Sequence, residues 1–184
     1  MTDFKLHTVE TAGESKALLE KSLKSHGFIP NLHAVMAESP AVLEAYQAVA
    51  GIFGKTKFSE TERQIIAMTN NRLNGCAYCM AGHTSIMQAA KVPEDVITAL
   101  REGTSLADPK LEALRVYAEK VNLSRGWPEA ADIDAFLAAG YTKENMLDVV
   151  LGTAFKVLSN YTNHVTQTPV DSVSAKNTWT PNAE

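Results

Sequence analysis

Apolar residues recur along the chain at the three- and four-residue spacing of amphipathic helices, and almost no segment alternates as a strand would. Residues 15–26 carry Leu18, Leu19 and Leu23 at this spacing. They are followed by Gly27, a residue suited to the left-handed turn that ends a helix. The pattern therefore predicts an all-α fold.

Capping signals divide the remaining chain into further helices. Ser39-Pro40 and Asp108-Pro109 each combine a good N-cap residue with a proline that suits the first helical turn. Ser59 begins a capping-box sequence. We expect helices over 31–38, 39–54, 59–74, 76–92, 108–124, 130–139 and 142–164, with a short one that ends at Gly103.

The chain shows no sign of division into domains. It has 184 residues, no linker, no low-complexity tract and no fixed repeat, so we expect one domain over 1–184. The core of this domain is expected to span about residues 40–125. The tail, residues 169–184, is expected to be irregular or to dock on the other helices. The last helix should bury a stripe formed by Met146, Val149, Val150, Ala154, Val157 and Leu158.

The composition argues against some classes of function. The net charge is -4 and no basic run occurs, so we expect neither nucleic acid nor a membrane surface as a partner. Residues 1–4 lack the features of a secretory signal, and no apolar run approaches the ~20 residues that span a bilayer. We therefore expect a cytoplasmic protein whose cysteines are reduced.

The chemistry of the chain is concentrated in residues 76–83. Cys76 and Cys79, the only cysteines, are followed by His83, and on a helix these offsets place all three side chains on one face. Redox chemistry is favoured over a zinc site, because a fourth ligand is missing and the spacing on one helix does not suit a tetrahedral cage.

These residues alone leave the nucleophile open. Cys76 lies at the expected start of its helix, where the positive end of the helix dipole favours a thiolate. His83 lies one turn from Cys79 and is placed to take its proton, directly or through water. The two effects favour different sulfurs.

Other polar and aromatic residues carry weaker signals. Trp127 and Tyr117 are expected in the core or at a subunit interface. His164 is as well explained by a structural cap or an interface as by catalysis. Asn71 and Arg72 precede the cysteines and either line the site or face solvent.

Residues 63–83, which read RQIIAMTNNRLNGCAYCMAGH, strongly resemble the core motif of the alkyl hydroperoxidase D-like (AhpD-like) branch of the carboxymuconolactone decarboxylase superfamily. The flanking segments 27–32, 39–46, 160–164 and 168–169 also resemble its peroxidase-related members. The resemblance implies a multi-helix AhpD-like bundle with helical subunit interfaces and a homo-oligomer. It also implies that Cys79 attacks a hydroperoxide, that Cys76 closes a disulfide, and that a lipoyl or thioredoxin-like dithiol protein returns the electrons.

Two positions depart from the family pattern. Gln64 stands where the motif usually has a glutamate that orients the histidine; it can accept a hydrogen bond but carries no charge. Glu60 and Glu62 lie nearby but on another face or turn. Tyr78 stands where peroxide-reducing members often have a second histidine, and a phenol with a pKa near ~10 is a poor base.

The sequence therefore predicts a peroxidase with Cys79, Cys76, His83 and Gln64 at its site, and with no metal or cofactor. A thiol-disulfide reductase and a non-enzymatic redox sensor remain as alternatives. Decarboxylation of a γ-lactone acid is disfavoured, because that branch of the superfamily does not depend on a Cys-x-x-Cys pair.

Overall fold

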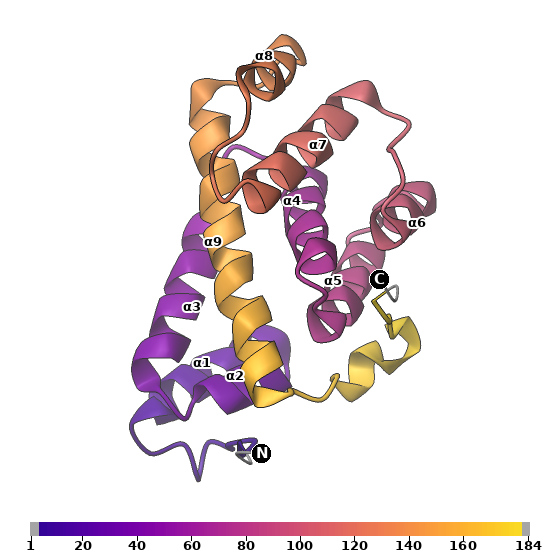
Figure 1. Cartoon of the computed structure of the whole chain (residues 1–184). Helices are drawn as coiled ribbons and strands as arrows, with labels where there is room; N and C mark the ends of the chain where they lie inside the picture. Colours follow the sequence, from indigo (N-terminus) through magenta and orange to yellow (C-terminus); the bar gives the residue numbers. More distant parts are fainter. Residues whose placement is uncertain (1–3, 182–184) are drawn as a thin grey trace.

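The computed structural model describes residues 4–181 and contains no strand in that range (Figure 1). The all-α prediction is confirmed. The elements are the 3₁₀ helix η1 (Gly13–Ser15), then α1 (Lys16–His26), α2 (Asn31–Met36), α3 (Pro40–Phe53), α4 (Glu60–Leu73), α5 (Ala77–Ala89), α6 (Glu94–Glu102), α7 (Pro109–Leu123), α8 (Ala130–Ala138), α9 (Lys143–Thr166) and the 3₁₀ helix η2 (Ser172–Asn177).

The long helix α9 organises the molecule. It packs against α3 on one side and against α4 and α7 on the other, while α5 lies against α4 (Figure 1). The close approach depends on Gly152 of α9, because a Cβ there would lie 2.7 Å from Ile66 Cγ2 and 2.8 Å from Phe53 Cε2. Both of these side chains belong to the main apolar core.

The predicted helix starts agree well with the structure. Ser59 Oγ accepts a hydrogen bond from the Glu62 amide at 3.2 Å, and the Glu62 carboxylate accepts one from the Ser59 amide at 2.8 Å. Asp108 Oδ1 accepts hydrogen bonds from the first amides of α7. The ends differ by a few residues, since α2 stops at Met36 and α9 continues to Thr166.

The predicted core face of α9 is partly wrong. Val150 and Ala154 are exposed, whereas Val149 is buried. The buried face also carries four polar side chains: Lys156, Ser159, Asn160 and Asn163. Hydrophobic periodicity could not identify this face, because much of what it buries is polar.

The two aromatic predictions have different outcomes. Tyr117 is buried and stacks on Phe136 with 4.2 Å between ring centroids. Trp127 lies in the loop between α7 and α8 with 84% of its surface exposed, so it is not part of the core of the chain, and the alternative of a subunit interface stays a prediction.

The segment after Pro169 docks on α5 through η2 (Figure 1). Arg101 donates hydrogen bonds to the carbonyls of Asn177 and Thr178, and Asn177 Nδ2 donates one to Ser85 Oγ. The predicted docked tail is thus seen as far as residue 181; its last three residues, and residues 1–3 at the start of the chain, lie outside the described range. None of the helices in that range is both long and apolar enough to cross a membrane.

Candidate active site

The two cysteines lie at the start of α5. Gly75 adopts φ +67°, a left-handed conformation that turns the chain from α4, and Cys76 then forms the N-cap of α5. Cys76 and Cys79 lie 3.3 Å apart, and both are reduced and almost fully buried. Cys79 is one turn into the helix, and His83 follows one turn later.

Polar side chains of α9 surround the sulfurs. Asn163 Nδ2 donates a hydrogen bond to Cys79 Sγ at 3.2 Å and lies 3.7 Å from Cys76 Sγ. Ser159 Oγ lies 3.9 Å from Cys79 Sγ. Asn160 is held beside them by Asn71, whose Oδ1 accepts from Asn160 Nδ2 at 2.9 Å. Asn71 is therefore fully buried in the wall of the site rather than facing solvent.

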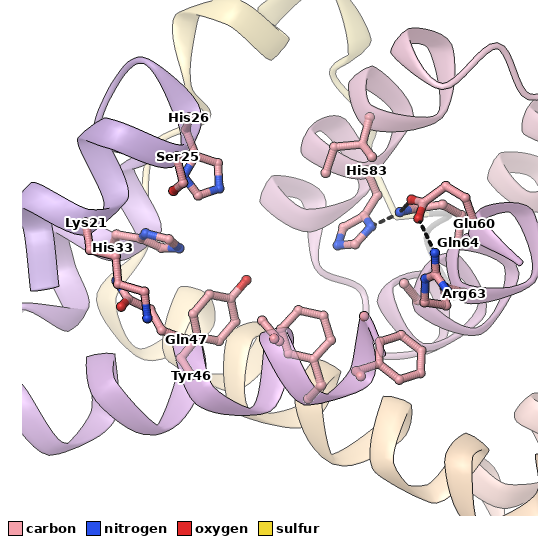
Figure 2. Close-up of a pocket in the computed structure, with 17 residues that line it drawn as sticks. Lys21, Ser25, His26, His33, Tyr46, Gln47, Glu60, Arg63, Gln64 and His83 are labelled. Carbon is pink, nitrogen blue, oxygen red and sulfur yellow. Dashed lines mark hydrogen bonds and ion pairs between the residues drawn. The ribbon is translucent and has the colours of Figure 1, made fainter. Parts of the chain in front are cut away.

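A series of hydrogen bonds that begins at Lys156 connects the buried site to the surface. Lys156 Nζ lies 2.8 Å from His83 Nε2, and His83 Nδ1 lies 2.7 Å from Gln64 Oε1. Gln64 Nε2 in turn donates to Glu60 Oε1 at 2.8 Å, and Glu60 pairs with Arg63 (Figure 2). Since the Gln64 amide donates to Glu60, its oxygen faces His83. His83 therefore carries its proton on Nδ1 and accepts from Lys156 at Nε2.

The two thiols have opposite pKa shifts. Burial alone would raise the pKa of Cys79, but a hydrogen bond from Cys76, the charge of Lys156 and hydrogen bonds from Asn160 and Ser159 lower it to about 5. The pKa of Cys76 is raised, first by its hydrogen bond to Cys79 and then by burial. At neutral pH the arrangement holds Cys79 as a thiolate and Cys76 as a thiol.

His83 is neutral in this arrangement. Burial, followed by the nearby charge of Lys156, lowers its pKa well below the ordinary value. The sequence analysis placed His83 to take the proton of Cys79, but Lys156 occupies Nε2, the imidazole nitrogen without a proton. Burial lowers the pKa of Lys156 as well, while the two cysteines act to raise it.

Two adjoining cavities reach this cluster. One, of about 310 Å³, is lined by Cys79, His83 and Lys156 at its floor and by Tyr46, Tyr78 and Val173 among its walls. Cys76 does not line it. The second, of about 440 Å³, opens between α1–α3 and α4–α5; Figure 2 shows His26, His33 and Tyr46 facing His83 and Gln64 across it.

Tyr78 is fixed in the wall of the first cavity. Its hydroxyl donates to Asp171 Oδ2 at 2.5 Å and accepts from the Leu32 amide at 3.1 Å. Burial and then the hydrogen bond to Asp171 raise its pKa above the ordinary range. Tyr78 therefore stays protonated and links α5 to the chain after Pro169.

A sequence profile of the carboxymuconolactone decarboxylase family matches residues 34–120, which contain both cysteines, His83 and Gln64. Residues 34–120 therefore form a carboxymuconolactone decarboxylase family region within the chain. A comparison with curated proteins found no significant match.

Solved structures give the fold of the AhpD-like branch. A peroxidase-related protein from Ralstonia eutropha JMP134, described as having an AhpD core, has 21% identity and a TM-score of 0.79, with 94% of this chain and 95% of that one covered. A peroxidase-related protein from Silicibacter sp. TM1040 has 19% identity and a TM-score of 0.80, with 94% and 92% covered. The debrominase Bmp8, solved as a cysteine-to-alanine variant with 2,3,4-tribromopyrrole, has 16% identity and a TM-score of 0.80, with 96% of each chain covered.

The family motif brought together Cys76, Cys79, His83 and Gln64, and the structure places these four in one cluster. Sequence reasoning missed Lys156, Ser159, Asn160 and Asn163 of α9. Their numbers follow the i, i+3, i+4, i+7 rule, so a polar stripe at helical spacing was the available signal. His164, in contrast, is exposed beside Tyr161 and away from the sulfurs. Within residues 4–181 no three His, Cys, Asp or Glu side chains cluster as metal ligands.

Proposed function

We propose that this protein is a cysteine-dependent peroxidase, which reduces hydroperoxides through a disulfide cycle of Cys79 and Cys76 in antioxidant defence. The observation that carries the proposal is the position of Cys79. Cys79 lines the 310 Å³ cavity and Cys76 does not, and the surrounding groups lower the pKa of Cys79 to about 5. A thiolate that faces a cavity is the form that attacks a peroxide.

In the oxidative half of the cycle, the hydroperoxide and the two cysteines balance in atoms and electrons. The Cys79 thiolate attacks the terminal oxygen of the hydroperoxide, the O–O bond breaks, and Cys79 becomes a sulfenic acid while an alkoxide leaves and takes up a proton. The Cys76 thiol then attacks the Cys79 sulfur and releases water, which leaves a disulfide. Asn163 bonds to both sulfurs and would hold them together through this step.

A dithiol donor must restore the thiols by exchange, and we propose a lipoyl or thioredoxin-like protein in the cytoplasm. Cys76 and Cys79 are 1% and 3% exposed, so the donor has to reach the disulfide through the cavity that Cys79 lines rather than across a flat surface. Access through a cavity favours a donor whose dithiol is carried on a narrow, extended group.

The first test is the intact mass of the reduced protein before and after one equivalent of an organic hydroperoxide. We expect a rapid loss of about two daltons as the disulfide forms. A second sample receives an oxidised dithiol, and a third receives 2,3,4-tribromopyrrole because one structural neighbour is a debrominase. A protein that stays reduced under peroxide would contradict the peroxidase proposal.

Thiol-disulfide exchange without peroxide turnover is the second candidate. It is favoured by Gln64, which gives His83 no negative partner, and by Tyr78, whose hydroxyl is committed to Asp171. Oxidation by the dithiol alone would select it, and oxidation with release of bromide would assign a halogenated substrate to the same sulfur pair.

We also propose that the protein is a homo-oligomer that pairs through α9. Large apolar side chains stay exposed along one side of that helix: Leu147 (73%), Val150 (48%), Tyr161 (56%) and Val165 (72%). Val165→Lys should shift the mass measured by light scattering towards a single chain, whereas Val173→Lys, at an exposed valine (58%) outside α9, should not. Equal masses for both variants would contradict the interface.

A further inference from the structure

Lys156 is a buried amine with no carboxylate beside it. It is 1% exposed, and within residues 4–181 its side chain is hydrogen-bonded to the neutral His83 and to Cys79. A buried ammonium is strongly unfavourable unless an anion compensates it. Across residues 4–181, the groups that act to keep Lys156 charged are Cys79 and Cys76.

The titratable groups around Lys156 leave one anion to pair with it, because Asp171, which lines the same cavity, is bonded to Tyr78 and the Asn31 amide and is not among the groups that act on the lysine. On α5, His83 is neutral and Cys76 is a thiol, so only Cys79 carries charge. On α3, Tyr46 is kept protonated, since burial and then Cys79 and Cys76 raise its pKa. On α2, burial and then His26 lower the pKa of His33 to about 4. On α4, Glu60 is separated from the lysine by Gln64 and His83.

We propose that Lys156 is the proton donor of the cycle: it pairs with the Cys79 thiolate in the reduced protein, protonates the departing alkoxide, and stays neutral while the disulfide is in place. This proposal rests on the proposed peroxidase function. Lys156 lines the same cavity as Cys79, so its ammonium lies where the leaving oxygen develops charge.

The protons balance over the cycle. The Cys79 thiolate, the Cys76 thiol, the Lys156 ammonium and a hydroperoxide become the disulfide, a neutral lysine, an alcohol and water. In the reductive half of the cycle, a donor dithiol is oxidised to a disulfide. Its two protons go to Cys76 and Lys156, and Cys79 returns to the thiolate form. Oxidation removes the one anion that compensates Lys156, and loss of the lysine proton removes the unpaired charge at the same time.

His83 is not placed for this role. Its single proton lies on Nδ1 and is donated to Gln64, while Nε2 accepts from Lys156. The imidazole thus orients the lysine, and Gln64 and Glu60 orient the imidazole. A neutral Lys156 can still donate to His83, so this contact is retained in the oxidised protein.

The first test follows the charge of Lys156 by NMR in the unaltered protein with ¹³C-labelled lysine, assigned from the signal missing in Lys156→Met. At neutral pH the Lys156 Cε signal should have the shift of an ammonium in the reduced protein and of a free amine after oxidation by diamide. Diamide replaces peroxide, so the result does not depend on peroxidase activity. An ammonium in both states, or an amine in both, would overturn the proposal.

The second test separates pairing from proton donation. Lys156→Arg keeps a cation that cannot be deprotonated. The midpoint of the Cys79 thiolate absorbance should stay at the same low pH as in the parent protein. Oxidation of this variant by an alkyl hydroperoxide should be on the order of 10²-fold slower than that of the parent. A peroxy acid, whose carboxylate leaves without a proton, should react with it at nearly the parent rate. Lys156→Met should raise the thiolate midpoint and slow both oxidants. If Lys156→Arg slows both oxidants equally, the proton-donor role is wrong.

Discussion

Replacement of Cys79 by serine is expected to abolish peroxide reduction, with kcat/KM falling by on the order of 10³-fold or more. Cys79 is the sulfur that lines the cavity, and the groups around it hold its thiolate at neutral pH. A serine hydroxyl stays protonated in the same surroundings and cannot be oxidised to a sulfenic acid. Steady-state consumption of an alkyl hydroperoxide with a small dithiol as donor measures the effect.

Cys76→Ser is the matched control, because it removes the neighbouring sulfur at the N-cap with the same change of atom. This variant should still react once with peroxide and then stop, with a gain of about sixteen daltons for the stable sulfenic acid. Cys79→Ser should show no change in mass. A sulfenic acid in Cys79→Ser and none in Cys76→Ser would reverse the roles of the two sulfurs.

The fold could be read from the sequence where local chemistry decides the structure. The Ser59 capping box and the Asp108-Pro109 pair fix helix starts through bonds within a few residues, and these predictions are confirmed. The orientation of Gln64 also had a local cause that sequence reasoning passed over. Glu60, one turn earlier on the same helix, accepts from the Gln64 amide and so directs its oxygen to His83.

The polar face of α9 could not be read in this way, because its burial depends on what it meets. Lys156 and Asn163 are 73 to 87 residues away in the sequence from the groups they bind, His83 and the cysteines. Hydrophobic periodicity assigned Val150 to the core, whereas these polar side chains are directed inwards to meet the sulfurs. Burial of a lysine is unfavourable for folding, and it is consistent with a role in the chemistry of the site.

Gly152→Val is expected to lower the free energy of unfolding by about 3 kcal/mol, the largest effect on stability that we predict. A Cβ at this position would lie 2.7 Å from Ile66 Cγ2 and 2.8 and 2.9 Å from two ring atoms of Phe53. Ile66 is 0% exposed and Phe53 is 4% exposed, so neither side chain can move into solvent. The helix containing the catalytic partners would therefore have to shift away from α3 and α4.

Gly51→Val provides the matched comparison, since Gly51 also lies within a helix but a Cβ added there would have no atom within 4 Å. Its effect should be within about 0.5 kcal/mol of zero, because a valine is somewhat better than glycine in a helix. Urea unfolding followed by circular dichroism at one protein concentration measures both variants. Equal stabilities would show that α9 adjusts its packing freely. In that case the spacing between Lys156 and Cys79 would not depend on the contact at Gly152.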